Sequence, residues 1–168
     1  MSDLTSAPVP PLGAGDHVRG PEGAPLVIMY ADFTCPRCAV AAERLRDAPV
    51  RTCFRHLALR ARHARAVPLA HLLEAATRQD AFWHLHDAVY GDQGRIDDPH
   101  IWAHAERLGL DVERLEADRR DPAVAERVEA DVRSALRAGA ATTPTLVLDG
   151  VLHDGVPGPE LLASLARS

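Results

Sequence analysis

One short segment constrains the fold more than any other, because an apolar stretch in it leads directly into a pair of cysteines at the start of a helical pattern. Residues 26–31 are apolar on both alternating faces, which indicates a central strand covered on both sides. Cys35 and Cys38 follow, a helix is expected over residues 39–46, and residues 50–59 have the pattern of a second strand. This succession predicts a βαβ unit with a right-handed crossover.

The chain then becomes helical almost throughout residues 61–138. Two Asp-Pro pairs, at 98–99 and 121–122, are typical helix starts, with the aspartate as N-cap and the proline in the first turn. Gly109 and Gly139 are expected to end these helices. Three apolar stripes predict core-facing sides of helices. They are Leu69, Leu72, Leu73 and Ala76; Phe82, Leu85 and Val89; and Val124, Val128, Val132 and Leu136.

Strand signals return after residue 139. Residues 145–148 and 151–153 flank Asp149-Gly150, a dipeptide typical of a tight hairpin turn, and residues 160–167 predict a final helix. The expected architecture is therefore an α/β domain of order βαβ…ββα, made of residues 16–60 and 139–168. An all-helical insertion over residues 61–138 interrupts it, and a flexible tail over residues 1–15 precedes it.

Composition narrows the functional classes. The 168 residues are 46% hydrophobic with a net charge of −5, which is typical of a globular domain and disfavours nucleic acid as a partner. The longest apolar run is far shorter than the ~20 residues of a membrane span, so no membrane partner is expected. All 19 basic residues are arginine, which excludes chemistry that needs a lysine. Because the first 15 residues lack the pattern of an export signal, we expect a cytoplasmic protein.

Cys35 has the position of a reactive thiol. It lies where a strand ends and a helix begins, so free backbone N–H groups and the helix dipole stabilise its thiolate. Pro36 fits the first helical turn, and Arg37 adds a cation; both are candidate residues that tune the thiolate. Cys38 lies one turn deeper and is expected to stay closer to an ordinary thiol. We therefore predict that Cys35 is the nucleophile and Cys38 the resolving thiol of a disulfide exchange.

A zinc site is the alternative use of these cysteines. Cys35, Cys38, Cys53 and His56 have a spacing compatible with a Cys3His site. Two features disfavour it: the intervening residues form a helix and a strand rather than knuckle turns, and Cys53 and His56 project to opposite faces of one strand. We expect Cys53 to be a small buried hydrophobic residue, and no metal or other cofactor to be bound. Arg55 and His56 could either tune the thiolate or belong to the core.

With these parts in place, the chain resembles the DsbA-like branch of the thioredoxin superfamily. The resemblance is carried by YADFTCPRC, VRTCFRHLAL, AFWHLHDAVYGD, AERLGLD and TTPTLVLDG, which together span nearly everything from residue 16 onwards. It implies a thioredoxin fold with a helical insertion. It also implies that Pro144 is cis and faces the cysteines, and that Thr143 offers its backbone to an extended substrate.

The activity implied by the resemblance is thiol–disulfide exchange with protein or low-molecular-weight thiol substrates, maintained by a reducing partner. The sequence departs from the family at Met29, where relatives commonly carry a buried acid thought to assist the resolving thiol. Two other functions stay open: a non-catalytic thioredoxin-fold binding module, and a thiol-conjugate transferase or isomerase. The intact Cys35–Cys38 pair disfavours both.

Overall fold

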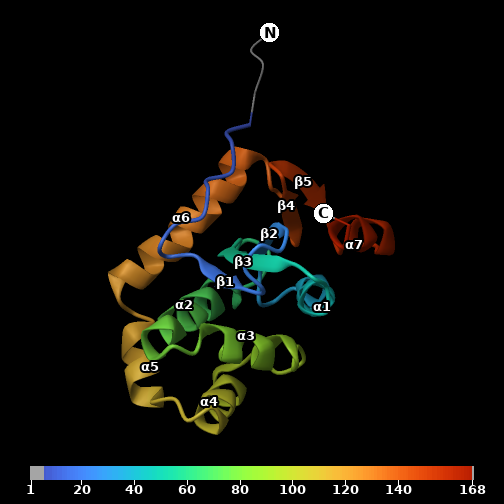
Figure 1. The fold of residues 1–168 in the computed structure, drawn as a ribbon. Coiled ribbons are helices and arrows are strands. Elements are labelled where there is room, and N and C mark those ends of the chain that lie inside the picture. Colours follow the sequence, from blue (N-terminus) through green and yellow to red (C-terminus); the bar gives the residue numbers. More distant parts are fainter. Residues whose placement is uncertain (1–5, 168) are drawn as a thin grey trace.

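The computed structural model describes residues 6–167 and contains a five-stranded mixed sheet with helices on both faces (Figure 1). The strand order is β1-β3-β2-β4-β5, with β2 and β3 parallel and all other pairs antiparallel. The strands are β1 (His17–Arg19), β2 (Leu26–Ala31), β3 (Arg51–His56), β4 (Thr145–Leu148) and β5 (Val151–Asp154). The predicted βαβ unit and the later hairpin are therefore both present, and β2 lies at the centre of the sheet.

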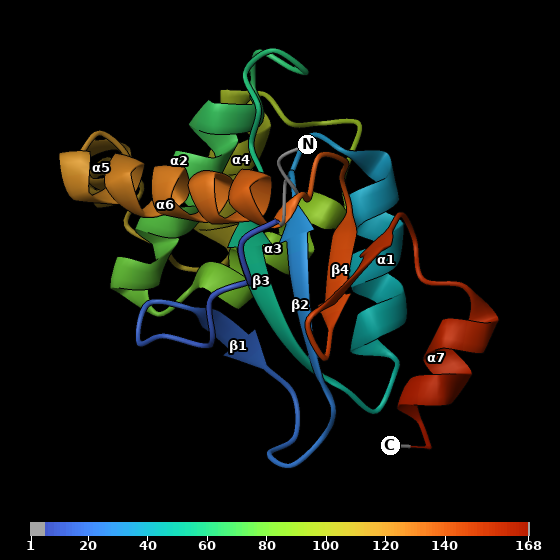
Figure 2. The ribbon, with the colours of Figure 1, turned by 90° about the horizontal axis from the view of Figure 1, so that it is seen from above.

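Seven α-helices and one short 3-10 helix lie within the described residues. They are α1 (Pro36–Arg46), α2 (Ala66–Ala76), η1 (Thr77–Gln79), α3 (Phe82–Tyr90), α4 (Asp98–Arg107), α5 (Val112–Asp118), α6 (Pro122–Ala138) and α7 (Pro159–Leu165). Of these described elements, α5, η1 and the short strand β1 were not predicted from the sequence. Figure 2 shows the helices between α2 and α6 gathered at the β1–β3 side of the sheet and α7 at the β4–β5 side.

Helix starts follow the capping chemistry of the sequence with one correction. Asp121 is the N-cap of α6, with Pro122 in the first turn, as predicted. For α4 the N-cap is Asp97, not Asp98, because the Asp97 side chain accepts the backbone N–H of His100. Two adjacent aspartates made either one a possible cap. At its other end α6 stops at Gly139, whose left-handed φ of 91° a residue with a side chain adopts less readily.

The apolar stripe of α6 is only partly in the core, which corrects the prediction for Leu136. Val124 and Val128 are buried, but Leu136 is 51% exposed and Ala135 is buried in its place. A helix turns by about 100° per residue, so each step of four residues rotates the stripe by about 40°. After three such steps Leu136 points away from the core, whereas Ala135 returns to the direction of Val124.

The hairpin between β4 and β5 turns at Asp149 and Gly150, as predicted. Both residues have positive φ, 47° and 79°, which is the conformation a two-residue primed turn requires. The resulting register pairs Thr145 with Asp154 and Leu148 with Val151. The hairpin completes the sheet beside β2 and brings residues 143–144 to the end of β2 that leads to Cys35.

Residues 6–16 lie on the domain, which differs from the flexible tail expected there; residues 1–5 of that tail lie outside the described residues. The N–H of Ala7 donates to the carbonyl of Arg137 in α6. Arg55 donates to the carbonyls of Pro10 and Pro11 and forms a salt bridge with Asp16. The carbonyls of a proline-rich segment are free to accept these bonds, and no sequence pattern indicated that a buried arginine would reach them.

The two faces of the sheet carry different cores. On one face, α1 and four helices of the insertion, α2, α3, α4 and α5, pack on residues such as Met29 and Phe54 through buried leucine, phenylalanine, isoleucine and alanine side chains. On the other face, α6 and the segment around Val9 cover Tyr30 and Cys53. Among residues 6–167 no helix has the length and apolar character needed to span a bilayer.

Candidate active site at the start of α1

Cys35 is the N-cap of α1, at the end of the loop that follows β2. Its φ of −98° and ψ of 111° are extended, and its Sγ accepts the N–H of Cys38 at 3.4 Å. The side chain is partly exposed. The pKa of Cys35 is lowered to about 6, mainly by hydrogen bonding with the Cys38 side chain; Thr143 and the N–H groups of Cys38 and Arg37 add to this, while burial opposes it. The hydrogen bonds at the start of α1 therefore favour the thiolate of Cys35.

Cys38 has the opposite environment. It lies one turn into α1, is fully buried and packs in the core between α1 and the sheet. Burial raises the pKa of its thiol, and the neighbouring sulfur of Cys35 raises it further. The two sulfurs are thus neighbours with well-separated pKa values, one accessible and one shielded. The shielding of Cys38 agrees with the sequence analysis, but its raised pKa departs from the nearly ordinary thiol expected there.

The loop before β4 faces Cys35. The peptide bond between Thr143 and Pro144 is cis, and the Cys35 thiol donates to the carbonyl of Thr143 at 3.6 Å. The chain positions 35 and 143 are brought together because β4 pairs with β2. The structure therefore places the candidate substrate-binding residues beside the candidate nucleophile.

The two residues between the cysteines are exposed. Pro36 occupies the first turn of α1. Arg37 contributes its backbone N–H to the lowered pKa of Cys35, while its side chain extends to the segment after β5. A methyl group placed on Gly155 would lie 2.6 Å from Arg37 Nη2. A role for the guanidinium charge in tuning the thiolate stays a prediction.

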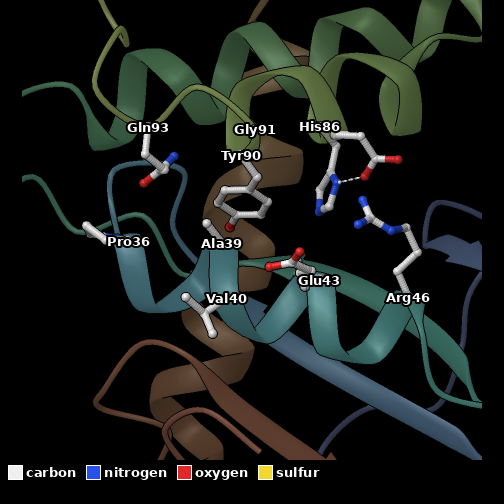
Figure 3. Close-up of a pocket in the computed structure, with 11 residues that line it drawn as sticks. Pro36, Ala39, Val40, Glu43, Arg46, His86, Tyr90, Gly91 and Gln93 are labelled. Atoms are coloured by element: carbon white, nitrogen blue, oxygen red, sulfur yellow. Dashed lines mark hydrogen bonds and ion pairs between the residues drawn. The ribbon is translucent and has the colours of Figure 1, made fainter.

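A groove of about 460 Å³ lies between α1 and α3, next to the cysteines. Figure 3 shows Pro36 at one end, Arg46 at the other, and the Tyr90 ring facing Ala39. His86, also from α3 and in the same wall, donates its Nδ1–H to the Asp87 carboxylate at 2.8 Å. The apolar stripe of this region predicted a helix, but no sequence signal indicated that Tyr90 and His86 lie near the cysteines.

The Cys3His zinc alternative is not formed among the described residues. Cys53 lies on the α6 face of the sheet, where burial raises its pKa to about 12, while His56 lies on the opposite face. The alternation of β3 separates them as predicted. Neither Arg55 nor His56 serves the thiolate: Arg55 binds Asp16, and His56 binds Glu74.

His56 instead belongs to a buried group that sequence reasoning missed. His17 of β1 and His56 of β3 each lie within hydrogen-bond distance of the same oxygen, Glu74 Oε2 of α2, at 2.7 and 3.0 Å. Their side chains have the chemistry of metal ligands. Each histidine is hydrogen-bonded to the Glu74 carboxylate, so the group links two strands of the sheet to α2 of the insertion.

Comparison with known proteins identifies the family. The sequence model of the DSBA-like thioredoxin domain matches residues 50–167, more than half of the chain. The chain belongs to the family of DsbA-like thioredoxin domains. The matched region of this DsbA-like domain begins after the two cysteines, so the match supports the fold and leaves the Cys35–Cys38 motif to the geometry described above.

Solved structures agree with the fold of the DsbA-like domain. A thioredoxin-like oxidoreductase from Silicibacter pomeroyi superposes with a TM-score of 0.83 at 24% identity, covering 92% of each chain. The thiol-disulfide exchange protein alpha-DsbA2 from Wolbachia pipientis has a TM-score of 0.80 at 16% identity, covering 92% of this chain and 87% of its own. The predicted thioredoxin fold with a helical insertion is confirmed.

Curated relatives of higher identity are longer proteins. The Na(+)/H(+) antiporter NhaA 3 of Salinispora tropica is 37% identical over 91% of this chain, and the Na(+)/H(+) antiporter NhaA of Herminiimonas arsenicoxydans is 40% identical over 89%. The matched part is 24% and 25% of those proteins, respectively. The DsbA-like domain thus spans about a quarter of the length of the curated relatives it matches.

Proposed function

We propose that this DsbA-like domain is a thiol–disulfide oxidoreductase in which Cys35 attacks a substrate disulfide and Cys38 resolves the mixed disulfide. The observation that carries the proposal is the contrast between the two sulfurs: Cys35 is partly exposed with its pKa lowered to about 6, whereas Cys38 is buried with a raised pKa. A thiolate near the surface attacks and leaves readily, and a shielded neighbour completes the exchange.

The proposed exchange passes through a mixed disulfide between Cys35 and the substrate. The Cys35 thiolate forms a bond with one substrate sulfur while the substrate disulfide breaks, and the other substrate sulfur leaves as a thiolate that takes a proton from solvent. Cys38 then attacks Cys35 Sγ, the substrate leaves, and the enzyme retains a Cys35–Cys38 disulfide. A reducing partner restores the dithiol. The reverse sequence oxidises a substrate dithiol.

Thr143 is proposed as the residue that meets the substrate. Its carbonyl lies 3.6 Å from Cys35 Sγ, next to the cis Pro144, so an extended segment whose disulfide reaches Cys35 also reaches this backbone. Pro36 and Arg37 are proposed to tune the thiolate from the first turn of α1. Protein disulfides or low-molecular-weight disulfides are the proposed substrates, without a bound cofactor.

Insulin reduction by dithiothreitol tests the activity. We expect the wild type to accelerate the reaction, Cys35→Ser to abolish the acceleration, and Cys53→Ala, which removes the third and buried cysteine, to retain it. Equal rates for the wild type and Cys35→Ser would leave a non-catalytic binding module, the competing function. The reduction potential of the pair then gives the preferred direction: about −270 mV indicates a reductase and about −120 mV an oxidant.

We also propose that the domain works in the cytoplasm with a reducing partner. Trapping thiols with an alkylating reagent in intact cells tests this, because a Cys35–Cys38 pair kept mainly as the dithiol is expected there. A pair found mainly as the disulfide would place the domain in an oxidising compartment. Ion transport is not proposed for this chain, since the antiporter relatives extend far beyond the matched quarter.

A further inference from the structure

The resolving step of the proposed exchange meets an electrostatic obstacle. Cys38 must become a thiolate in a place where it is fully buried and where its pKa is raised. Met29, a fully apolar side chain, packs in the same core on β2. β2 therefore carries no acid that could assist the ionisation of Cys38. A different group has to stabilise the Cys38 thiolate.

Tyr90 of α3 is the polar side chain positioned for this. It is only 8% exposed, and its ring is held between Phe33 and His86, with ring centroids 4.9 and 4.8 Å away. Its hydroxyl donates to the carbonyl of Asp32 at 3.1 Å, and the N–H of Cys35 donates to the same carbonyl at 3.2 Å. Figure 3 shows the hydroxyl directed at α1 beside Ala39, the residue after Cys38.

The electrostatics of Tyr90 agree with this placement. Burial raises the pKa of Tyr90 well above its usual value, and the neighbouring Cys38 and Asp32 side chains raise it further. The hydroxyl therefore stays protonated and remains a donor. His86, whose pKa is lowered to about 4 by burial, is neutral near pH 7 and offers Cys38 no charge.

We propose that the Tyr90 hydroxyl turns from the Asp32 carbonyl to Cys38 Sγ and donates a hydrogen bond to the thiolate as it forms. The inference rests on the proposed function and assigns Tyr90 a catalytic role in its second step. A hydrogen bond to an anion is roughly twice as strong as one to a neutral acceptor, so the developing charge on sulfur favours the change of partner.

In the resolving step the Cys38 thiolate displaces the substrate from Cys35. In the mixed disulfide Cys35 Sγ is bonded to the substrate sulfur, and Cys38 gives its proton to solvent. The Cys38 thiolate attacks Cys35 Sγ; the Cys35–Cys38 bond forms, the bond to the substrate breaks, and the substrate leaves as a thiolate with the electron pair. Tyr90 keeps its own proton throughout and returns to the Asp32 carbonyl.

The carboxylate of Asp32 does not compete for this role. Its Oδ1 accepts both the N–H and the hydroxyl of Thr34, each at 2.8 Å. Its negative charge raises the pKa of Cys38, which opposes formation of a thiolate. A backbone hydrogen bond from Asp32 does lower the pKa of Cys38, but burial and the Cys35 side chain raise it by more. The Tyr90 hydroxyl would add a second donor to the Cys38 thiolate.

A chromogenic disulfide separates the two steps. Reduced protein mixed with dithiobis(nitrobenzoate) releases one nitrothiobenzoate when Cys35 attacks and a second when Cys38 resolves the mixed disulfide. For Tyr90→Phe we expect an unchanged first phase, a second phase slowed about tenfold or more, and a pH midpoint of the second phase at higher pH. Tyr30→Phe is the matched control, because Tyr30 is a buried tyrosine whose hydroxyl pairs with Ser134 on the other face of the sheet.

The two phases distinguish failure of the proposed function from failure of the inference on Tyr90. Absence of the fast first phase in the wild type would reject the proposed function itself. Two phases in the wild type with an equal second phase in Tyr90→Phe would overturn the role of Tyr90 alone. If Tyr90→Phe does not fold, fluorotyrosine incorporated into Tyr30→Phe labels only Tyr90, since the chain has two tyrosines. This more acidic donor should speed the second phase, and an unchanged rate would again overturn the inference.

Discussion

At the scale of single residues, three positions along α1 separate two cysteines with opposite properties. Cys35 caps the helix, where backbone N–H groups point at its sulfur, and Cys38 is turned into the core. Both effects are general: free N–H groups at a helix start stabilise an anion, and burial disfavours one. These two effects give the sulfurs different pKa values, as the proposed roles of an attacking and a resolving thiol require.

The pH dependence of alkylation measures this difference. Because the pKa of Cys35 is lowered to about 6, its reaction with iodoacetamide should be half-maximal near pH 6 and level off above about pH 7. The reduced folded protein is stabilised by this ionisation at pH values above the unfolded pKa, near 9, and that stabilisation is lost as the pH falls through about 6. Mass spectrometry locates the modified residue, and Cys35→Ser is the control. An alkylation midpoint near pH 9 would contradict the lowered pKa of Cys35.

At the scale of elements, capping residues and turns set where each helix and strand begins and ends. Asp121 and Gly139 delimit α6, and Asp149-Gly150 makes the hairpin, all through local backbone chemistry. The loop between β1 and β2 adds a long-range requirement. Gly20 has a φ of 112° and packs against β3, so that a Cβ there would lie 2.4 Å from the carbonyl oxygen of Val50.

Two glycines of this loop form a matched test. Gly23 also has positive φ, 81°, but a Cβ there would meet nothing within 4 Å. We expect Gly23→Ala to lower the free energy of unfolding by about 1 kcal/mol through backbone strain, and Gly20→Ala by roughly 3 kcal/mol because the clash with backbone is added. Urea unfolding followed by circular dichroism measures both. Similar losses for the two variants would show that β1 can move away from β3 without cost.

At the scale of the whole molecule, the helical insertion has to be held on the sheet. Glu74 of α2 joins His17 and His56, which belong to two neighbouring strands, through one carboxylate oxygen. The hydrogen bonds from both histidines lower the pKa of Glu74, although burial opposes this. The stabilisation is present above the unfolded pKa, near 4.5, and is lost as the pH falls through the lower folded pKa.

Replacing this carboxylate should loosen the junction between insertion and sheet. We expect Glu74→Gln to lower the free energy of unfolding by about 2 kcal/mol, because a charged acceptor shared by two buried donors is lost. Glu129→Gln on the exposed side of α6 is the matched control and should leave the free energy nearly unchanged. Hydrogen exchange would locate the effect at β1, β3 and α2; an effect confined to α2 would mean that the histidines find other partners.

The sequence by itself determined the elements that depend on neighbours in the chain. The central strand, the cysteines at a helix start, the α6 cap and the hairpin turn all follow from periodicity and capping within a few residues. The position of Cys35 at a helix start follows from the same local physics, whereas the burial of Cys38 also needs the packing of α1 on the sheet.

Only the tertiary structure decided which distant side chains meet. Thr143 reaches Cys35 because β4 pairs with β2, and Tyr90 reaches α1 because α3 packs across it. The link from Glu74 to His17 and His56 likewise joins three elements. Such contacts depend on how whole elements pack, and the pattern of a single segment carries no information about the segment it will face.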